Sequence, residues 1–326
     1  MKIDEGKKKI ISLLLVIAIN LLCLGAGYYF LVMCDLSGEQ KENTIEIGMS
    51  YMTMNNEFYS IVSQEIIARI EAEGDRYVIR DPGLNEERQE EQIREMVEHG
   101  IDVLVVTPVN SETICPLLRE LKEQGIIIIV VDSDAEETGL ADCTITSDNY
   151  TAGRNVGAYY ALTHQKAKLV LMIQSTAMSG VERVRGFKTA IENTPGIEIV
   201  AEIECEGQTE IAMPKMQEVL ESGLEFDDVF CLNDLAAVGV VAALEEKGLL
   251  DQVGVYGVDA SPDAKALIYE NMMVATAAQY PTKIGSKTAD AIYQILEGEK
   301  TDSYIRVPTT LVTGDNVLEL GIDRWQ

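Results

Sequence analysis

The sequence contains few positively charged residues. Lysine and arginine together number 26, aspartate and glutamate number 54, and the formal net charge at pH 7 is −28. Without the first nine residues the imbalance is larger still, with 22 basic residues against 52 acidic ones. Because proteins bind phosphate backbones mainly through lysine and arginine, we expect no nucleic-acid partner.

Histidine is scarce, and no cysteines are paired in a CxxC motif. The chain has two histidines, His99 and His164, and six cysteines, and it lacks a nucleophile elbow, a phosphate-binding loop and a histidine-containing dyad. We therefore expect no metal site, no cofactor and no enzymatic activity. Both histidines end predicted helices, where they would interact favourably with the helix dipole. Cys115 and Cys231 lie in apolar patterns that are typical of core residues.

One long stretch near the N-terminus has no charge at all. It comprises residues 10–33, IISLLLVIAINLLCLGAGYYFLVM, and three lysines precede it. About 20 apolar residues suffice to cross a bilayer, so these residues predict a transmembrane anchor. The preceding lysines place residues 1–9 in the cytoplasm as a tail and everything after the span outside the cytoplasm. Residues 34–44 would then form a polar tether at the cell membrane.

Two other interpretations of the N-terminus stay open. The tetrapeptide Leu31-Val32-Met33-Cys34 is similar to a lipoprotein cleavage box, in which case a lipid on Cys34 would anchor the protein. Met33, however, stands where a small residue is expected. A cleaved signal peptide is the third interpretation, but no small-x-small cleavage site follows the apolar run.

The most apolar run of the remaining chain ends in acids. Residues 126–134 read IIIIVVDSD, six β-branched residues followed by Asp132. An unbroken run of this kind predicts a strand buried on both faces, as in a parallel sheet covered by helices. Ligands of such sheets collect at the carboxyl ends of the strands. Asp132 is therefore either a ligand-facing acceptor or the N-cap of a following helix.

From residue 45 onward, short apolar runs alternate with longer amphipathic segments. The predicted strands are 45–51, 76–80, 102–106, 126–131, 143–146, 168–173, 197–203, 228–232, 253–258 and 274–280, with a further extended run at 304–312. The predicted helices between them are 57–74, 85–99, 111–124, 151–164, 180–193, 209–222, 234–247 and 281–298. This alternation predicts an α/β protein with two doubly wound parallel-sheet lobes joined by a hinge.

The two halves repeat one design at their strand ends. VLVVTP at 103–108 corresponds to VFCLND at 229–234, and the IIIIVVDS run corresponds to VGVYGVDA at 253–260, which ends on Asp259. Each half thus directs polar groups to one sheet edge. If the two edges face each other, a ligand lies in a cleft between the lobes.

Eight motifs in this order carry a resemblance to a known family. They are NNEFY (55–59), VVTPVNS (105–111), VVDSD (130–134), TSDNYTAGR (146–154), ERVRGF (182–187), CLNDLAAVG (231–239), GVDASPDA (257–264) and AAQYPTKIG (277–285). With them, residues 45 to about 316 resemble the bacterial sugar-binding proteins of the ribose-binding type. These are type I periplasmic binding proteins, whose fold is shared with the ligand domains of LacI-like repressors. A repressor is excluded, because an apolar span replaces the helix-turn-helix segment.

The resemblance implies lobe boundaries and a binding site. It divides the body into an N-terminal lobe, 45–147 plus 280–307, and a C-terminal lobe, 148–279 plus 308–326, with hinges near Ser147, Gln279 and Pro308. The positions that it assigns to the ligand site are Asn56, Phe58, Tyr59, Asp132, Ser133, Arg183, Asn233, Asp259 and Gln279. Carboxylates, amides and a guanidinium group match the paired hydroxyls of a polyol, and aromatic faces cover the C–H face of a ring.

The sequence departs from the ribose-type pattern at three places. Ser133 stands where a second arginine is expected, Thr107 stands at a family asparagine, and an aromatic residue is missing near Gly207. These changes weaken the case for ribose itself and leave a different sugar or an inositol open. Asp234 is an alternative N-cap for the helix at 234, and we leave it out of the ligand set.

Several polar residues near the strand ends are predicted to start helices. Asp148 and Asn149 would cap a helix at the lobe crossover, and Asn110 and Ser111 would open another. The function that the resemblance implies is an extracytoplasmic solute-binding protein that closes on a sugar and delivers it to an ABC-type permease. The alternative is a ligand-sensing subunit that presents the sugar-bound state to a sensor kinase or receptor.

Overall fold

The computed structural model describes residues 5–33 and 44–326, and side chains for residues 14–29 and 44–326. Helix α1, Glu5–Met33, belongs to one compact unit, and a second unit comprises Ile45–Gln326. A search of the described residues finds no helix with both the length and the apolar character needed to cross a membrane. The structure therefore does not support the predicted anchor at 10–33. The tether from residue 34 to residue 43 and the lipidation alternative at Cys34 lie outside the described residues.

The first sheet of the body contains six parallel strands in the order β11-β5-β4-β3-β1-β2. Their bounds are β1 Glu46–Ser50, β2 Arg76–Arg80, β3 Val103–Val106, β4 Ile127–Val131, β5 Cys143–Ser147 and β11 Tyr304–Val307. Strand β4 is buried along nearly its whole length, as its unbroken apolar run predicts.

The second sheet also has six strands, in the order β12-β10-β9-β8-β6-β7. The bounds are β6 Ala167–Ile173, β7 Ile197–Glu204, β8 Asp228–Cys231, β9 Gly254–Tyr256, β10 Ala275–Ala278 and β12 Thr310–Thr313. Only the pairing of β12 with β10 is antiparallel among these strands, so a parallel sheet carries one antiparallel edge.

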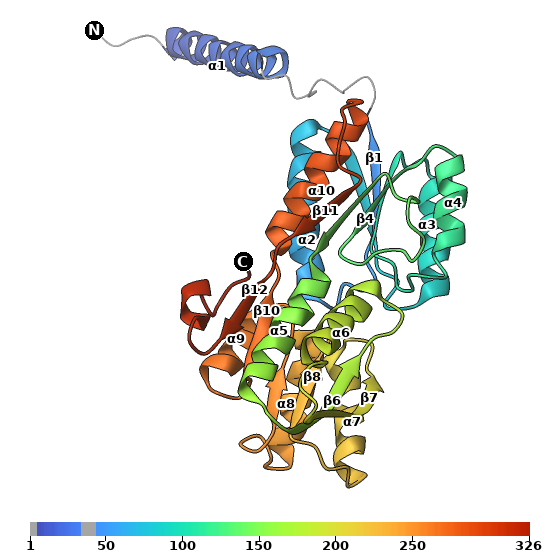
Figure 1. Cartoon of the computed structure of the whole chain (residues 1–326). Helices are drawn as coiled ribbons and strands as arrows, with labels where there is room; N and C mark the ends of the chain where they lie inside the picture. Colours follow the sequence, from blue (N-terminus) through green and yellow to red (C-terminus); the bar gives the residue numbers. More distant parts are fainter. Residues whose placement is uncertain (1–4, 34–43) are drawn as a thin grey trace. The chain divides into compact units, whose positions relative to one another are not determined.

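Helices cover the sheets to form two α/β lobes, as predicted (Figure 1). The first lobe contains α2 Glu57–Glu73, α3 Glu86–Glu98, α4 Cys115–Glu123 and α10 Pro281–Leu296. The second contains α5 Asn149–Thr163, α6 Met178–Ile191, α7 Thr209–Glu221, α8 Asp234–Glu246, α9 Pro262–Tyr269 and the 3-10 helix η1 Val317–Leu320. In Figure 1, α2 and α10 lie on one side of the first sheet and α3 and α4 on the other. Two apolar cores, one on each side, fill that lobe.

Two elements differ from the sequence-based expectation. Helix α9 was not predicted, because its eight residues begin at Pro262, directly after Ser261, in a segment without a clear apolar period. The extended run at 304–312 is two strands, β11 and β12, which belong to different sheets. Pro308 between them has no N–H group to continue a strand ladder.

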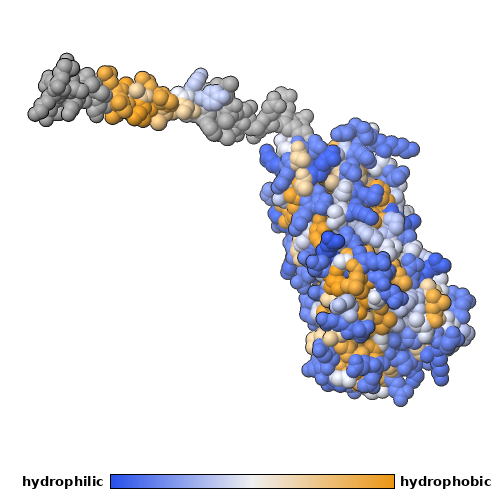
Figure 2. Space-filling model, turned by 90° about the vertical axis from the view of Figure 1, so that its left-hand side faces the viewer, coloured by the Kyte–Doolittle hydropathy of each residue, from blue (hydrophilic) through white to orange (hydrophobic). Residues whose placement is uncertain are grey.

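The chain passes between the two lobes at three places. They are the links from β5 to α5, from β10 to α10 and from β11 to β12. The first lobe therefore consists of an N-terminal segment and a later segment that contains α10 and β11. The side of the body drawn in Figure 2 is mostly hydrophilic, with hydrophobic residues gathered mainly on the lower, second lobe.

Candidate functional site

Two aspartates with unusual backbone conformations end corresponding strands in the two lobes. Asp132 follows β4 with φ +68°, and Asp259 follows β9 with φ +137°. Positive φ is uncommon for residues other than glycine, and such positions gather at functional sites. Both carboxyl groups are nearly fully buried, with 4% and 3% of the residue exposed. The internal repeat in the sequence thus corresponds to a positive φ at both strand ends.

Only one of the two carboxylate oxygens of Asp132 has a hydrogen-bond partner among the described residues. Tyr59 on α2 donates its hydroxyl hydrogen to Oδ2 at 2.9 Å, whereas Oδ1 is buried and has no partner. Burial raises the pKa of Asp132, and the nearby Arg183 charge and the Tyr59 bond act in the opposite direction. Burial likewise raises the pKa of Tyr59 well above its usual value, and the neighbouring Asp132 adds to this rise. A hydrogen-bond donor from a ligand would complete the shell of Oδ1.

Arg183 and Gln279 converge on Asp259. Arg183 Nη1 donates to Asp259 Oδ1 at 3.2 Å and to the carbonyl oxygen of Leu232 at 3.1 Å. Gln279 Nε2 donates to the same Oδ1 at 2.6 Å, and Gln279 Oε1 is buried without a partner. Burial raises the pKa of Asp259 to about 7, against the effect of Arg183. The site therefore contains two carboxyl groups and one guanidinium group. Gln279 Oε1 is its second hydrogen-bond acceptor without a donor, after Asp132 Oδ1.

The close contact between helices α5 and α6 positions Arg183. A Cβ atom on Gly153 would lie 1.8 Å from the Arg183 carbonyl oxygen, and one on Gly186 would lie 2.0 Å from that of Tyr150. Only glycine permits this approach. Asn149, at the start of α5, accepts a 2.8 Å hydrogen bond from Arg183 Nε. Asn149 therefore orients the guanidinium group, while the N-cap is Asp148 as predicted.

Two asparagines of the predicted site serve as helix N-caps. Asn56 Oδ1 accepts from Phe58 N at the start of α2. Asn233 Oδ1 accepts from Ala236 N at the start of α8, and its Nδ2 donates to the Gly207 carbonyl oxygen. The sequence predicts neither cap and offers Asp234 as an alternative for α8. Asp234 instead accepts hydrogen bonds from Ser261 N and Thr276 Oγ1.

Eight of the nine predicted site residues line one small cavity between the lobes. They are Asn56, Phe58, Tyr59, Asp132, Arg183, Asn233, Asp259 and Gln279. The cavity volume is about 30 Å³, which is room for one or two water molecules. Ser133 does not line it. Its hydroxyl oxygen accepts a 3.1 Å hydrogen bond from Ser179 N, which links the first lobe to the second.

The same cavity is lined by residues that the sequence reasoning missed. They are Met52, Thr53, Gln174, Ser179, Gln208 and Leu232. Gln174 directly follows β6, so the rule that polar groups at strand ends face ligands would have found it. Gln208 precedes α7 without capping it, and no sequence signal marked it. Both amides are buried and lie near Gly207, where the family's aromatic residue is missing.

The other predicted features have structural roles. Cys115 and Cys231 are buried, and Cys143 and Cys205 are buried as well. His99 and His164 end α3 and α5, and each ring lies within hydrogen-bond distance of a carbonyl oxygen of the last turn. Ser111 does not lie within a helix, because α4 begins only at Cys115; its hydroxyl donates to the Thr176 carbonyl oxygen of the other lobe.

A family model and a curated relative both match most of this chain. The family model described as periplasmic binding protein domain matches residues 47–300. The chain is 26% identical over 277 residues to the ribose import binding protein of Bacillus subtilis, covering 85% of this chain and 89% of that protein.

Two of the solved structures with similar folds carry bound myo-inositol. A Caulobacter myo-inositol binding protein with bound myo-inositol is 26% identical, with a TM-score of 0.79, covering 86% of this chain and 96% of that one. An ABC transporter solute-binding protein of Bacillus halodurans, also with myo-inositol, has a TM-score of 0.80 at 24% identity. That match covers 87% of this chain and 99% of the other.

Proposed function

We propose that this chain, which belongs to the periplasmic binding protein family, is a sugar-binding protein of the ribose type that binds a monosaccharide or related polyol between its two lobes. The residues proposed to contact the ligand are Asn56, Phe58, Tyr59, Asp132, Arg183, Asn233, Asp259 and Gln279. Ser133 would act indirectly, through its bond to Ser179.

The two unpartnered oxygens in the cavity carry this proposal. Asp132 Oδ1 and Gln279 Oε1 are both acceptors, both buried and both without a hydrogen-bond partner among the described residues. A buried acceptor without a donor costs about 1 to 3 kcal/mol. Sugar hydroxyls supply such donors, and each also accepts a hydrogen bond from a group such as Arg183.

Aromatic rings and polar side chains both line the cavity. Phe58 and Tyr59 supply the rings, with their centroids 5.4 Å apart and their planes nearly perpendicular. Gln174 and Gln208 lie where the family's second aromatic residue is missing. A ligand with an apolar face on one side and a hydroxyl on the other matches one set of rings and one set of amides. This favours a cyclitol or a sugar with an axial hydroxyl group over a ring that is apolar on both faces.

Binding requires the lobes to separate first, because a monosaccharide is several times larger than the 30 Å³ cavity. The structure is closed, with lobe-to-lobe hydrogen bonds such as Asn55 Nδ2 to Glu210 Oε1 at 3.0 Å. We propose that lobes 45–147 plus 280–307 and 148–279 plus 308–326 rotate about hinges near Ser147, Gln279 and Pro308, where the chain crosses between them.

A thermal-shift screen tests this function. Pentoses, hexoses, deoxysugars and inositols are added singly to the purified protein, and the melting temperature is recorded. A ligand that binds only the folded state adds about 2.7 kcal/mol at a hundredfold excess over its Kd, which is easily seen. Absence of any shift across the whole panel would refute the sugar-binding proposal.

The partner is a finer proposal. We propose delivery of the ligand to an ABC-type permease, as for the ribose import relatives. Presentation of the sugar-bound state to a sensor kinase is the alternative. Reconstitution with the permease encoded nearest to this gene distinguishes the two. Ligand-dependent stimulation of the permease ATPase supports transport, whereas the absence of stimulation supports sensing.

Attachment to the membrane is a further proposal and rests on the apolar run at 10–33. The side chains described cover only residues 14–29 of that run, and much of this part of α1 is coloured hydrophobic in Figure 2. We propose that the run anchors the protein. Intact-mass measurement of membrane-extracted protein should find the N-terminal lysines retained. A lipid on an N-terminal Cys34 would show the lipoprotein alternative to be correct.

A further inference from the structure

The last seven residues connect the two lobes outside the three crossovers. Leu320, the last residue of η1, and Ile322 pack against the apolar core of the second lobe. Trp325, three residues later, packs against the core of the first lobe. Figure 1 places the C-terminus at the level where the lobes meet. We call residues 320–326 the C-terminal strap.

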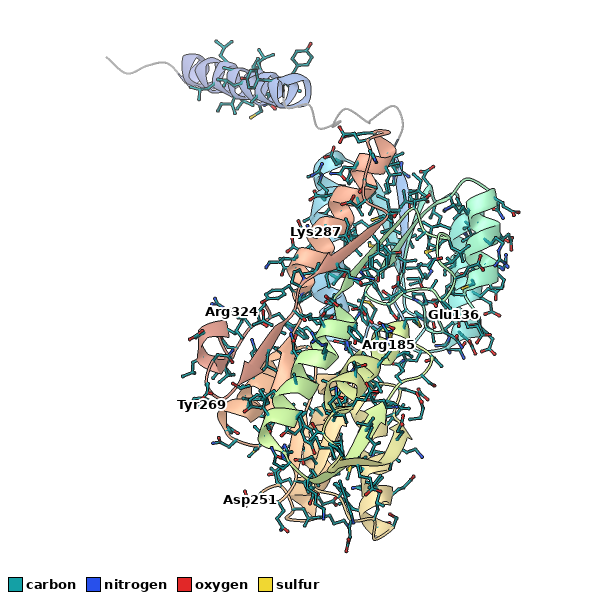
Figure 3. The ribbon with its side chains drawn as sticks, in the orientation of Figure 1. Glu136, Arg185, Asp251, Tyr269, Lys287 and Arg324 are labelled. Atoms are coloured by element: carbon teal, nitrogen blue, oxygen red, sulfur yellow. The ribbon has the colours of Figure 1, made fainter. Side chains whose placement is uncertain are left out.

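A buried lysine fixes the strap to the second lobe. Lys265 on α9 is fully buried, and its Nζ donates to the carbonyl oxygens of Gly321, at 2.6 Å, and Arg324. Burial lowers the pKa of Lys265. A buried ammonium group is costly without hydrogen-bond partners, so the strap and Lys265 hold each other in place. Arg324 is labelled in Figure 3 near the C-terminal end of the chain.

Trp325 contacts the first lobe directly behind the wall of the cavity. Its Nε1 donates to Glu57 Oε2 at 2.9 Å, and its ring lies edge-on to Phe58 with centroids 5.9 Å apart. Glu57 and Phe58 are the first two residues of α2. Phe58 lines the cavity, whereas Trp325 does not.

We propose that Trp325 is a positioning residue for ligand binding, through which the C-terminal strap holds Phe58 and the closed arrangement of the lobes. This inference rests on the proposed function. Rotation that opens the cleft moves α2 away from a strap that Lys265 keeps on the second lobe. Contacts that exist only in the closed state increase its population and so increase ligand affinity.

The contact has a built-in reporter, because Trp325 is the only tryptophan in the sequence. Its fluorescence should change when myo-inositol or D-ribose closes the lobes. Hydrogen–deuterium exchange of the amides at the start of α2 reports the same contact without any ligand.

The test compares four full-length proteins: the parent, Trp325→Ala, Trp325→Phe and Tyr269→Ala. Tyr269 is a matched control, because it is an aromatic residue of the same lobe that is 57% exposed (Figure 3). Trp325→Phe keeps a ring against Phe58 but loses the bond to Glu57.

Without ligand, we expect the amide hydrogens at the start of α2 to exchange several-fold faster in Trp325→Ala than in the parent. We also expect this variant to bind the ligand found in the sugar screen about three- to tenfold more weakly. Trp325→Phe should recover most of both losses, and Tyr269→Ala should match the parent. If Trp325→Ala has the same amide exchange as the parent, or the same ligand affinity, the proposed role of the strap is wrong, even when the parent binds a sugar. If no sugar binds the parent, the proposed function fails, and ligand-free exchange alone decides whether the strap holds the lobes.

Discussion

Tyr59 donates a 2.9 Å hydrogen bond to Oδ2 of Asp132, while Oδ1 of the same carboxyl group is buried without a partner. One half of the carboxylate is thus satisfied by the first lobe itself. Asp132 itself has a left-handed backbone conformation and lines the cavity. The site is organised in advance for a donor that the described residues do not provide.

Tyr59→Phe should destabilise the protein, and more so at high pH. The Tyr59 bond lowers the pKa of Asp132, so its loss raises that already elevated pKa further and makes ionised Asp132 more costly. We expect the free energy of unfolding to fall by about 1 to 3 kcal/mol at pH 8 and by less at pH 5. Urea denaturation at both pH values measures this. Tyr51→Phe is the control, because the Tyr51 hydroxyl donates only to Met49 Sδ, at 3.6 Å. Equal losses in both variants would contradict the prediction.

Asp259 should make stability fall as pH rises. Its pKa in the folded protein is about 7 against an ordinary value of 3.8, so between these values the folded state binds a proton that the unfolded state has released. The contribution of this group to stability therefore decreases from about pH 4 to about pH 7 and is constant above that range. Urea midpoints of the parent and Asp259→Asn across pH 4 to 8 test the sign. Parallel curves for the two proteins would show that Asp259 titrates normally.

Arg183→Met should abolish tight ligand binding. The change keeps much of the side-chain volume. It removes the positive charge that counteracts the burial-induced rise in the pKa values of Asp132 and Asp259. Two lost charged hydrogen bonds at about 1.5 to 3 kcal/mol each weaken affinity about a hundredfold or more. The bonds to Leu232 and Asn149 are lost as well, so a lower melting temperature is also expected.

Arg185→Met provides the matched control for Arg183→Met. Arg185 lies on the same helix but is exposed, paired with Glu182 and placed over the Tyr150 ring. Calorimetry should find that Arg185→Met binds the sugar with the same affinity as the parent. An Arg183→Met protein that binds sugar as tightly as the parent would mean that the arginine is purely structural.

Gly153→Ala should damage the site from a distance. The new methyl group would overlap the Arg183 carbonyl oxygen and force α6 away from α5. Overpacking of this kind costs about 1 to 3 kcal/mol of stability, and we expect at least a tenfold loss of affinity as Arg183 moves. Gly314→Ala is the control, since a Cβ atom there meets nothing within 4 Å. Melting curves and titration calorimetry of both variants decide the matter, and a Gly153→Ala protein that behaves like the control would disprove the helix contact.

Sequence reasoning recovered those features that local patterns determine. The unbroken apolar run before Asp132 predicted a buried parallel strand, and the repeat at Asp259 predicted its counterpart. It failed where tertiary contacts decide. Asn149 looks like a cap because it begins a helix, yet it orients Arg183. No pattern near Gln208 or Trp325 indicates that the fold brings them to the cleft or to Phe58.

Construction of the first lobe from two separated segments has a consequence for biosynthesis. Ile284 and Ile292 of α10 pack in the same core as Ile66 and Ile70 of α2, and β11 forms the edge of the first sheet beside β5. A nascent chain that has emerged only as far as Ser147 lacks both elements. The second lobe, by contrast, has all but its last strand and C-terminal residues once β10 has emerged. During translation, the lobe encoded first is therefore the one whose sheet is still incomplete when most of the other has already been made.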